Sequence, residues 1–291
     1  MVTDSTAYLT DEQCERYSIY RLPLSVIMGN DVIEEMNITN TDFFKRVEKM
    51  DALPTSSQPT IGQAIALFNE LSKNYDAVIS VHLSSELSGT YNTIASLANI
   101  YEGLKIYPYD SGISCSAQGY FVLEAARMAN EGSTIEEIFH TFEKMQPTLQ
   151  AYFVVNDLHH LVRGGRLSNG SAMIGSLLKI KPVLHFEDKK ITVFEKIRTK
   201  KKALKRIEEI LGEDVAKGYP IVSTIIHANA EQEPVEWMES LKHRYPTIRY
   251  EISYFGPVIG THLGEGALGI TWIEDLTKKL SYYTIFIEKR C

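Results

Sequence analysis

The chain has 291 residues, of which 44% are hydrophobic, a share that suffices for globular cores and is too high for a disordered chain. Its formal net charge of −7 argues against a nucleic-acid partner, which calls for a basic surface. The three cysteines, Cys14, Cys115 and Cys291, form no CxxC pair, so we expect a reducing cytoplasm rather than a secreted disulfide framework. No apolar run approaches the about 20 residues of a membrane-spanning helix.

The first half of the chain alternates predicted helices and strands. Residues 77–83 are short, apolar and β-branched, which predicts a buried strand. Apolar residues recur at helical spacing over residues 61–71 and 91–101. A further helix is predicted to begin at Ser133, whose hydroxyl would form a capping box with Glu136. Strand–loop–helix units build parallel sheets, which bind ligands at the carboxyl ends of their strands.

From about residue 150 the pattern changes to hairpin strands mixed with helices. The predicted strands are 151–155, 179–186, 191–196, 221–227 and 248–254, and the predicted helices are 199–211 and 236–244. We therefore expect two α/β domains with a ligand between them. A Rossmann-like domain with a parallel sheet would span residues 1–150, and a domain with a mixed sheet would span residues 151–291. The tail ending in residues 282–287 is either an extra strand or an appendage.

His262 lies in residues 255–269, a stretch that contains five glycines. Glycine serves where backbone turns with positive φ or approaches another group closely, so the stretch predicts a loop that positions the imidazole. Such a histidine can bind an anion as imidazolium, act as a general base, or only pack. No HxH or HExxH spacing accompanies it, so we expect no metal site.

Two serine-containing segments are the predicted partners of His262. Ser56 and Ser88 each offer a hydroxyl, and a pair of hydroxyls can hold both oxygens of a carboxylate without adding charge. The alternative is that Ser56 and Ser57 only form a turn, while Ser88 caps a helix that begins near Gly89. Capping and anion binding are compatible, because a helix N-terminus favours negative charge.

Two arginines are further candidates. Arg166 lies across a Gly-Gly turn from Arg163, and the pair can present a guanidinium to a phosphate or carboxylate. The turn also fits a helix end with Gly164 as C-cap and the arginines complementing the helix dipole. Arg198 is similar, with a surface role equally open. The segment 3–6 is either a substrate loop or, as we favour, a turn stabilised by Asp and Ser side chains. No GxxxxGK[ST], GxGxxG or GxSxG motif is present, so neither a nucleotide site nor a hydrolase triad is indicated.

Taken together, these motifs resemble those of the DegV family in type and order, over roughly residues 2–273. The segments that carry the resemblance are 3–6 (TDST), 54–59 (PTSSQP), 87–91 (LSGTY), 164–166 (GGR) and 260–266 (GTHLGEG). Position 56 is usually threonine in this family, so this chain keeps the hydroxyl and loses a methyl group.

The resemblance implies a cytoplasmic bacterial protein that buries a long-chain fatty acid such as palmitate between two α/β domains. Family members serve phospholipid metabolism as the binding subunit of a fatty-acid kinase, whose separate ATP-dependent subunit phosphorylates the carboxylate. The resemblance also implies that Ser56 and Ser88 face the carboxylate, with His262 near it. It further implies that this chain needs no cofactor and performs no catalysis itself. Residues implied for the site or for kinase docking are Ser57, Thr90, Arg166 and Arg198.

Two other functions stay open from the residues alone. A small-molecule hydrolase or phosphotransferase would use His262 as base and Ser88 as nucleophile. A regulatory protein would sense lipid without any kinase.

Overall fold

The computed structural model describes residues 1–168 and 180–277. Its N-terminal half contains a sheet in the order β2-β1-β6-β7, in which all neighbouring strands are parallel. The strands are β1 (Val2–Asp4), β2 (Tyr20–Leu22), β6 (Ala77–His82) and β7 (Lys105–Asp110). Only the first residue of β6 is exposed, as expected for a parallel strand covered by helices on both faces. The predicted parallel sheet is confirmed.

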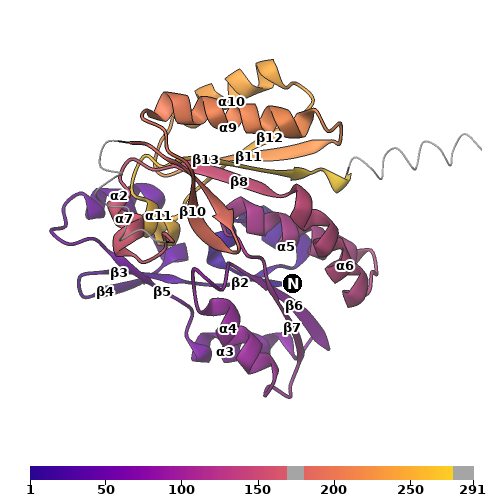
Figure 1. Cartoon of the computed structure of the whole chain (residues 1–291). Helices are drawn as coiled ribbons and strands as arrows, with labels where there is room; N and C mark the ends of the chain where they lie inside the picture. Colours follow the sequence, from indigo (N-terminus) through magenta and orange to yellow (C-terminus); the bar gives the residue numbers. More distant parts are fainter. Residues whose placement is uncertain (169–179, 278–291) are drawn as a thin grey trace, which may run out of the picture.

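Helices cover both faces of this sheet. On the lower face in Figure 1 lie α3 (Ile61–Leu71) and α4 (Thr90–Ala98), whose Phe68 and Ile94 pack with Val78 of β6. On the opposite face lie α1 (Asp11–Tyr17), α5 (Cys115–Asn130) and α6 (Ile135–Met145). There Phe121 and Phe142 pack with Val81. Val78 and Val81 thus lie on opposite faces of β6, so its alternating side chains contribute to two separate cores.

The C-terminal half contains a mixed sheet in the order β10-β9-β8-β13-β11-β12, in which only β11 and β12 run parallel. The strands are β8 (Gln150–Val154), β9 (Val183–Glu187), β10 (Lys190–Glu195), β11 (Ile221–His227), β12 (Arg249–Tyr254) and β13 (Leu268–Glu274). The predicted β9-β10 hairpin is confirmed, and its turn places Asp188 and Lys189 at positive φ, the geometry that matches strand twist. The expected boundary between residues 150 and 151 stays a prediction.

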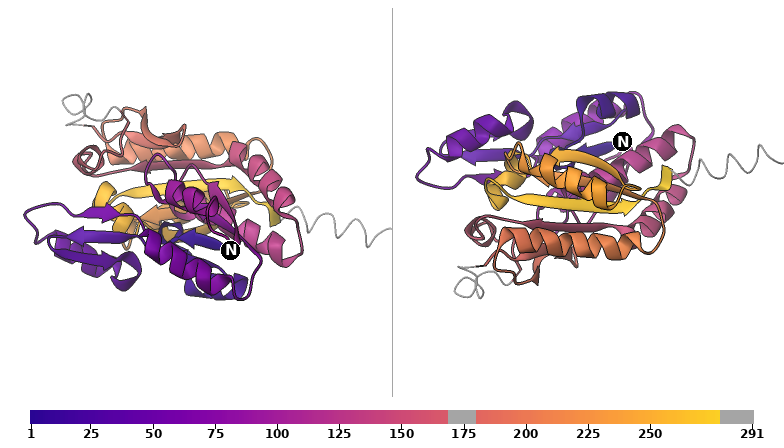
Figure 2. Two further views of the ribbon diagram at one scale, coloured as in Figure 1. Left: turned by 90° about the horizontal axis from the view of Figure 1, so that it is seen from below. Right: turned by 90° about the horizontal axis from the view of Figure 1, so that it is seen from above.

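The outer face of the mixed sheet is covered by α9 (Lys200–Val215) and α10 (Glu233–Arg244). Its inner face meets α5, which contacts both β6 and β13. The chain is therefore a stack of α9 and α10, the mixed sheet, α5 and α6, the parallel sheet, and α3 and α4 (Figures 1 and 2). This layering places the carboxyl end of β6 and the inner face of β13 on either side of α5.

A third, smaller antiparallel sheet was not predicted from the sequence. It has the order β4-β3-β5 and lies beside the main stack in Figure 1, next to α2 (Asn40–Val47). Its strands are β3 (Ser25–Met28), β4 (Asp31–Glu34) and β5 (Thr55–Ser57). Ser56 lies on β5 opposite Val26, so strand pairing rather than a free turn fixes its position.

Two sequence predictions are wrong in detail. The stretch around His262 is not a loop, because Pro257–Leu263 form the short helix α11 with Pro257 in its first turn. The α6 capping box belongs to Thr134 and Glu137, one residue after the predicted pair: Glu137 N donates to Thr134 Oγ1, and Thr134 N donates to the Glu137 carboxylate. The remaining elements are α7 (His159–Arg163) and the 3₁₀ turns Ser5–Ala7, Glu35–Asn37 and Gln146–Thr148. Residues 282–287, Lys179 and Cys291 lie outside the described residues.

Replacing Thr134 by alanine should lower the free energy of unfolding by about 1 kcal/mol, because the Glu137 backbone N–H would lose the hydroxyl that accepts its hydrogen bond. Ser133→Ala is the matched control and should have little effect, since Ser133 takes no part in the capping box. Urea unfolding of both variants measures the difference. Equal destabilisation by the two would contradict the assignment of the cap.

Candidate functional site

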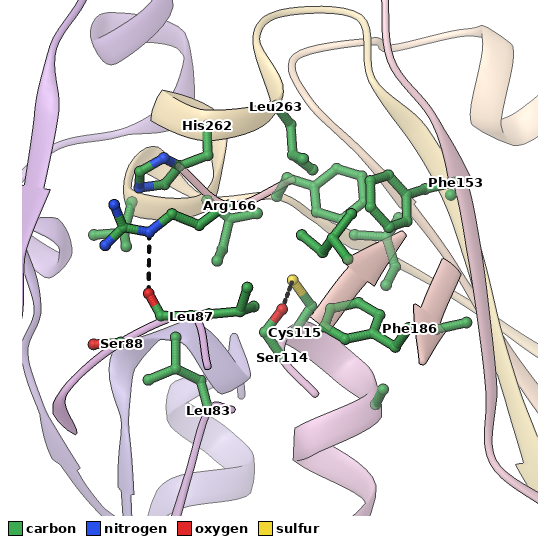
Figure 3. A pocket seen from close by; sticks show the side chains of 18 of the residues that line it. Leu83, Leu87, Ser88, Ser114, Cys115, Phe153, Arg166, Phe186, His262 and Leu263 are labelled. Atoms are coloured by element: carbon green, nitrogen blue, oxygen red, sulfur yellow. Dashed lines mark hydrogen bonds between the residues drawn. The ribbon is translucent and has the colours of Figure 1, made fainter. Parts of the chain in front are cut away.

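A cavity of about 340 Å³ lies between the layers, in the size range of small-molecule sites. Its walls come from both halves of the chain, and Figure 3 shows Leu83 and Ser88 facing Phe153 and Phe186 across it. Most of the lining is apolar. The apolar residues include Leu24, Leu83, Leu87, Cys115, Phe153, Phe186, Ile226, Phe255, Val258 and Leu263.

Ser56, Ser88, Arg166 and His262 lie together on one side of this cavity, whereas Ser114 and Thr271 line it elsewhere. Ser56 Oγ lies 2.8 Å from His262 Nε2, a hydrogen bond between residues 206 positions apart in the sequence. Ser88 and Arg166 lie on the same side as His262 (Figure 3), and Ser57 also lines the cavity. Thr271 and its partner Ala151 line the cavity two residues beyond Gly269 and Phe153, farther along β13 from α11, and Ala117 of α5 lines it as well. The arrangement suits a ligand with one polar group and a long apolar part.

Helix α11 holds His262 in place through close packing. A Cβ at Gly260 would lie 2.8 Å from the Phe44 ring, so glycine there lets α11 pack directly on α2. A Cβ at Gly164 would lie 2.4 Å from His262 Nδ1, so the backbone after α7 passes against the imidazole. The glycines therefore act through close approach, although the predicted loop is a helix.

His262 is held in its neutral form. Burial, followed by the positive charges of Arg166 and His160, lowers the pKa of His262 from 6.5 to about 4. An imidazole with this pKa is uncharged near neutral pH and carries one proton, so it donates one hydrogen bond and accepts another. In the described structure, therefore, His262 does not serve as an imidazolium anchor.

Arg166 and Ser88 are fixed by local hydrogen bonds. Arg166 Nε donates to Leu87 O at 3.1 Å (Figure 3), and a second guanidinium nitrogen donates to Gly164 O. Ser88 Oγ lies 2.9 Å from Thr90 Oγ1 and accepts a 3.3 Å hydrogen bond from Thr90 N at the start of α4. Ser88 and His262 are thus each hydrogen-bonded to another residue and do not form a nucleophile–base pair.

Two of the predicted site residues, Thr90 and Arg198, do not line the cavity. Thr90 is buried beneath Ser88 and does not line the cavity. Arg198 is exposed before α9 and lies outside it. Thr3 and Asp4 end β1, and Ser5–Ala7 form a 3₁₀ turn in which Asp4 accepts hydrogen bonds from the backbone N–H and the hydroxyl of Thr6. The favoured turn is therefore correct for Asp4 but not for Ser5, whose hydroxyl donates to Glu35. Of the candidates, the structure brings Ser56, Ser57, Ser88, Arg166 and His262 together, and their binding role stays a prediction.

Two further features of the structure were not predicted from the sequence. Ser80, His82 and Asp4 form a hydrogen-bonded row, with 2.7 Å between Ser80 Oγ and His82 Nε2 and 3.1 Å between His82 Nδ1 and Asp4 Oδ2. All three side chains are fully buried and line none of the described cavities, so the row joins β1 to β6 and is not a hydrolytic triad. Cys115 lines the cavity, and burial raises the pKa of its thiol to about 12, so it behaves as an apolar group.

Within residues 1–168 and 180–277, no group of three or more His, Cys, Asp or Glu side chains is placed to hold a metal ion. None of the helices in these two ranges is both long enough and apolar enough to span a bilayer.

Arg166→Gln should raise the pKa of His262 from about 4 toward 6.5, because a neighbouring positive charge is removed while burial remains. An NMR titration of the His262 ring protons measures this change. Arg46→Gln, on the exposed side of α2, is the charge-matched control and should leave the titration unchanged. A His262 that titrates near pH 6.5 in the unaltered protein would contradict the electrostatics described here.

Comparison with known proteins identifies relatives along nearly the whole chain. The profile of the DegV family, described as a family of uncharacterised proteins, matches residues 1–275. Protein DegV of Bacillus subtilis (strain 168) is 51% identical over 274 residues, covering 94% of this chain and 98% of that protein. A DegV domain-containing protein of Listeria monocytogenes is 48% identical, covering 94% and 97% respectively.

Solved structures agree with these relatives. The crystal structure of DegV from Bacillus subtilis, described as a fatty acid binding protein, matches with a TM-score of 0.89 and 50% identity, covering 94% of this chain and 98% of that one. A fatty acid binding DegV family protein from Streptococcus agalactiae matches with a TM-score of 0.87 and 37% identity, at the same coverage. The fold, the motifs and these relatives agree, and the chain belongs to the DegV family.

Proposed function

We propose that this chain binds a long-chain fatty acid such as palmitate in the cavity between its layers, with the carboxylate at the Ser56 end. The observation that carries the proposal is the make-up of the site, a largely apolar cavity in which Ser56, Ser88, Arg166 and His262 form one polar group. The Bacillus and Streptococcus relatives described as fatty acid binding support the same ligand class.

The apolar walls supply most of the affinity. Burial of a methylene contributes about 0.8 kcal/mol, so the roughly 14 methylenes of palmitate contribute about 11 kcal/mol before the costs of ordering and association. The carboxylate then needs only enough hydrogen bonds to replace its water, because a buried unpaired anion costs several kcal/mol.

Ser56, Ser88 and Arg166 provide those hydrogen bonds. When neutral His262 donates from Nε2 to Ser56 Oγ, the Ser56 hydroxyl proton is free to point at a carboxylate oxygen. Ser88 offers a second hydroxyl and Arg166 a nearby positive charge, both on the same side of the cavity. His262 acts in this proposal by orienting Ser56.

We place this binding in the cytoplasm, as one half of a fatty-acid kinase serving phospholipid metabolism. A separate ATP-dependent subunit would phosphorylate the bound acid: a carboxylate oxygen forms a bond to the γ-phosphorus, the bond from that phosphorus to ADP breaks, and ADP leaves. The absence of GxxxxGK[ST] and GxGxxG motifs supports an external source of ATP. Exposed Arg198 is a candidate for docking that subunit. The rival hydrolase or phosphotransferase with Ser88 as nucleophile and His262 as base gains no support, because these two residues are not paired.

Ser56→Ala should weaken palmitate binding by about 1 to 2 kcal/mol, or roughly five- to thirtyfold in Kd, because one hydrogen bond to a charged group is lost. Isothermal titration of delipidated protein measures the change. Ser96→Ala, on the exposed face of α4 and outside the cavity, is the matched control and should bind as the unaltered protein does. Unaltered protein that binds no fatty acid of any length would refute the proposed function, whereas unchanged affinity in Ser56→Ala would refute only the carboxylate site.

A further inference from the structure

Two buried side chains from the N-terminal half of the chain hold the first turn of α11. Val258 N donates to Glu35 Oε1 at 2.9 Å. Ile259 N donates to Tyr8 Oη at 3.4 Å, and Tyr8 Oη in turn donates to Glu35 Oε1 at 2.8 Å. A helix leaves its first backbone N–H groups without partners inside the helix, and here the carboxyl and the phenol together satisfy two of them.

The backbone before α11 passes directly against this pair. A Cβ at Gly256 would lie 2.2 Å from Tyr8 Cε1 and 2.8 Å from Glu35 Oε1, so glycine is needed for this close approach. Gly256 is also the N-cap residue of α11 and has no side chain that could accept a hydrogen bond from the helix. Glu35 and Tyr8 therefore take the place of the missing cap.

The turn that this pair holds also forms part of the fatty-acid site. Val258 and His262 both line the apolar cavity, and they lie four residues apart, about one helical turn. His262 Nε2 is the atom that lies 2.8 Å from Ser56 Oγ. A shift of the first turn of α11 would therefore be passed to His262 and, through it, to the hydroxyl of Ser56.

The Glu35 carboxyl can exchange protons with solvent. It lines a second cavity, of about 580 Å³, whose walls include Pro257 at the start of α11 and the exposed Thr39 and Thr41. Glu35 itself is only 5% exposed. Burial raises the pKa of Glu35 to about 7, and the hydrogen bonds that it accepts offset this shift only in part. The group is therefore ionised above about pH 7 and protonated below it.

Other titratable or charged groups face Glu35 or share its cavity, and they come from several elements. They are Asp4, Tyr8, Asp11, Arg21, Cys115, His227, Glu231 and Tyr254. Burial lowers the pKa of His227 below 6.5, so its imidazole is already neutral at pH 7. Burial raises the pKa values of Tyr8, Cys115 and Tyr254, so these groups stay protonated. A change of charge near pH 7 in this cluster therefore falls on Glu35.

Protonation of Glu35 would weaken its hold on α11. Hydrogen bonds to an ionised acceptor are roughly twice as strong as those to a neutral one. Because Oε1 already accepts two hydrogen bonds, the proton belongs on Oε2, which now accepts from Ser5 Oγ at 2.6 Å. Ser5 Oγ also accepts from Leu24 N at 3.0 Å, so reversing its bond to Glu35 would leave the Ser5 hydroxyl proton in need of a new acceptor.

We propose that Glu35 and Tyr8 are positioning residues of the fatty-acid site: the ionised carboxylate holds α11 where His262 orients Ser56, and uptake of a proton by Glu35 loosens this arrangement and weakens binding. The inference rests on the proposed function and adds a pH dependence to it. Neither Glu35 nor Tyr8 lines the apolar cavity, so both act through α11. Affinity is thus highest above the pKa of Glu35 and falls as the pH decreases through about 7.

The test compares Glu35→Gln with the unaltered protein, since an amide has the shape of the carboxyl group without its charge. Isothermal titration of delipidated protein with palmitate gives the ratio of the two Kd values at pH 8 and at pH 6. We expect Glu35→Gln to raise the Kd about fivefold at pH 8, where a neutral acceptor replaces a charged one, and less than about twofold at pH 6, where both groups are neutral. Effects of pH on palmitate itself are common to both proteins and cancel in the ratio.

Two further variants accompany this comparison. Glu48→Gln removes an exposed carboxylate at the end of α2, outside both cavities, and should give a ratio near one at both pH values. Tyr8→Phe removes the hydroxyl and keeps the ring, and it should raise the Kd about threefold at pH 8. It tests the positioning role independently if Glu35→Gln does not fold.

Four outcomes would count against these claims. A ratio near one at both pH values for Glu35→Gln, with Tyr8→Phe also unchanged, would show that the pair does not position the site. An equal loss at pH 8 and pH 6 would make Glu35 a structural group whose charge has no role. Tighter binding by Glu35→Gln at pH 8 would show that the carboxylate repels the ligand. Unaltered protein that binds no palmitate at either pH would instead refute the proposed function, without any variant.

Discussion

The buried carboxyl group of Glu35 fixes the helix on which the site depends. It accepts hydrogen bonds from Ser5 Oγ at 2.6 Å, Tyr8 Oη at 2.8 Å and the backbone N–H of Val258 at 2.9 Å. One N-terminal donor of α11 is thereby satisfied from the N-terminal half of the chain. Burial raises the pKa of Glu35 to about 7, because desolvation disfavours the charged carboxylate, while the three hydrogen bonds partly offset this shift. Through the hydrogen bond between Glu35 and Val258, α11, which carries His262, is anchored to the N-terminal half of the chain, which also contains Ser56.

The cavity follows from how the layers meet. Alternate residues of β13 face opposite sides, so Leu268 and Trp272 join the core under α9 and α10 while Gly269 and Thr271 face the cavity. The carboxyl end of β6 supplies Leu83 and the Ser88 turn from the other side, where parallel sheets commonly bind ligands. The two sheets therefore supply most of the apolar wall and the Ser88 turn. The remaining polar residues, Ser56 and His262, are contributed by β5 and α11.

Sequence periodicity predicted the regular elements well, because β6, β11 and the amphipathic helices each bury a continuous apolar face. The β4-β3-β5 sheet was not predicted, because its strands are short and β5 consists of polar residues. The glycines around His262 led us to predict a loop. The segment forms the helix α11 instead, because it packs against Phe44 and its Val258 N–H donates to Glu35, and these tertiary contacts are not visible in the local sequence. Ser56, Ser88 and His262 were recognisable as motifs. That Ser56 pairs with His262 beside Arg166 and Ser88 depends on packing between distant elements, which no local pattern encodes.

The central claim is that a fatty acid lies in the cavity with its carboxylate at Ser56 and its chain running toward Ala151 and Thr271. A crystal structure of delipidated protein with palmitate brominated at its terminal carbon tests this most directly, because bromine is located by its anomalous scattering. We expect the carboxylate within hydrogen-bond distance of Ser56 Oγ and the bromine beside Ala151 and Thr271. A bromine beside His262, or a ligand bound outside this cavity, would contradict the account.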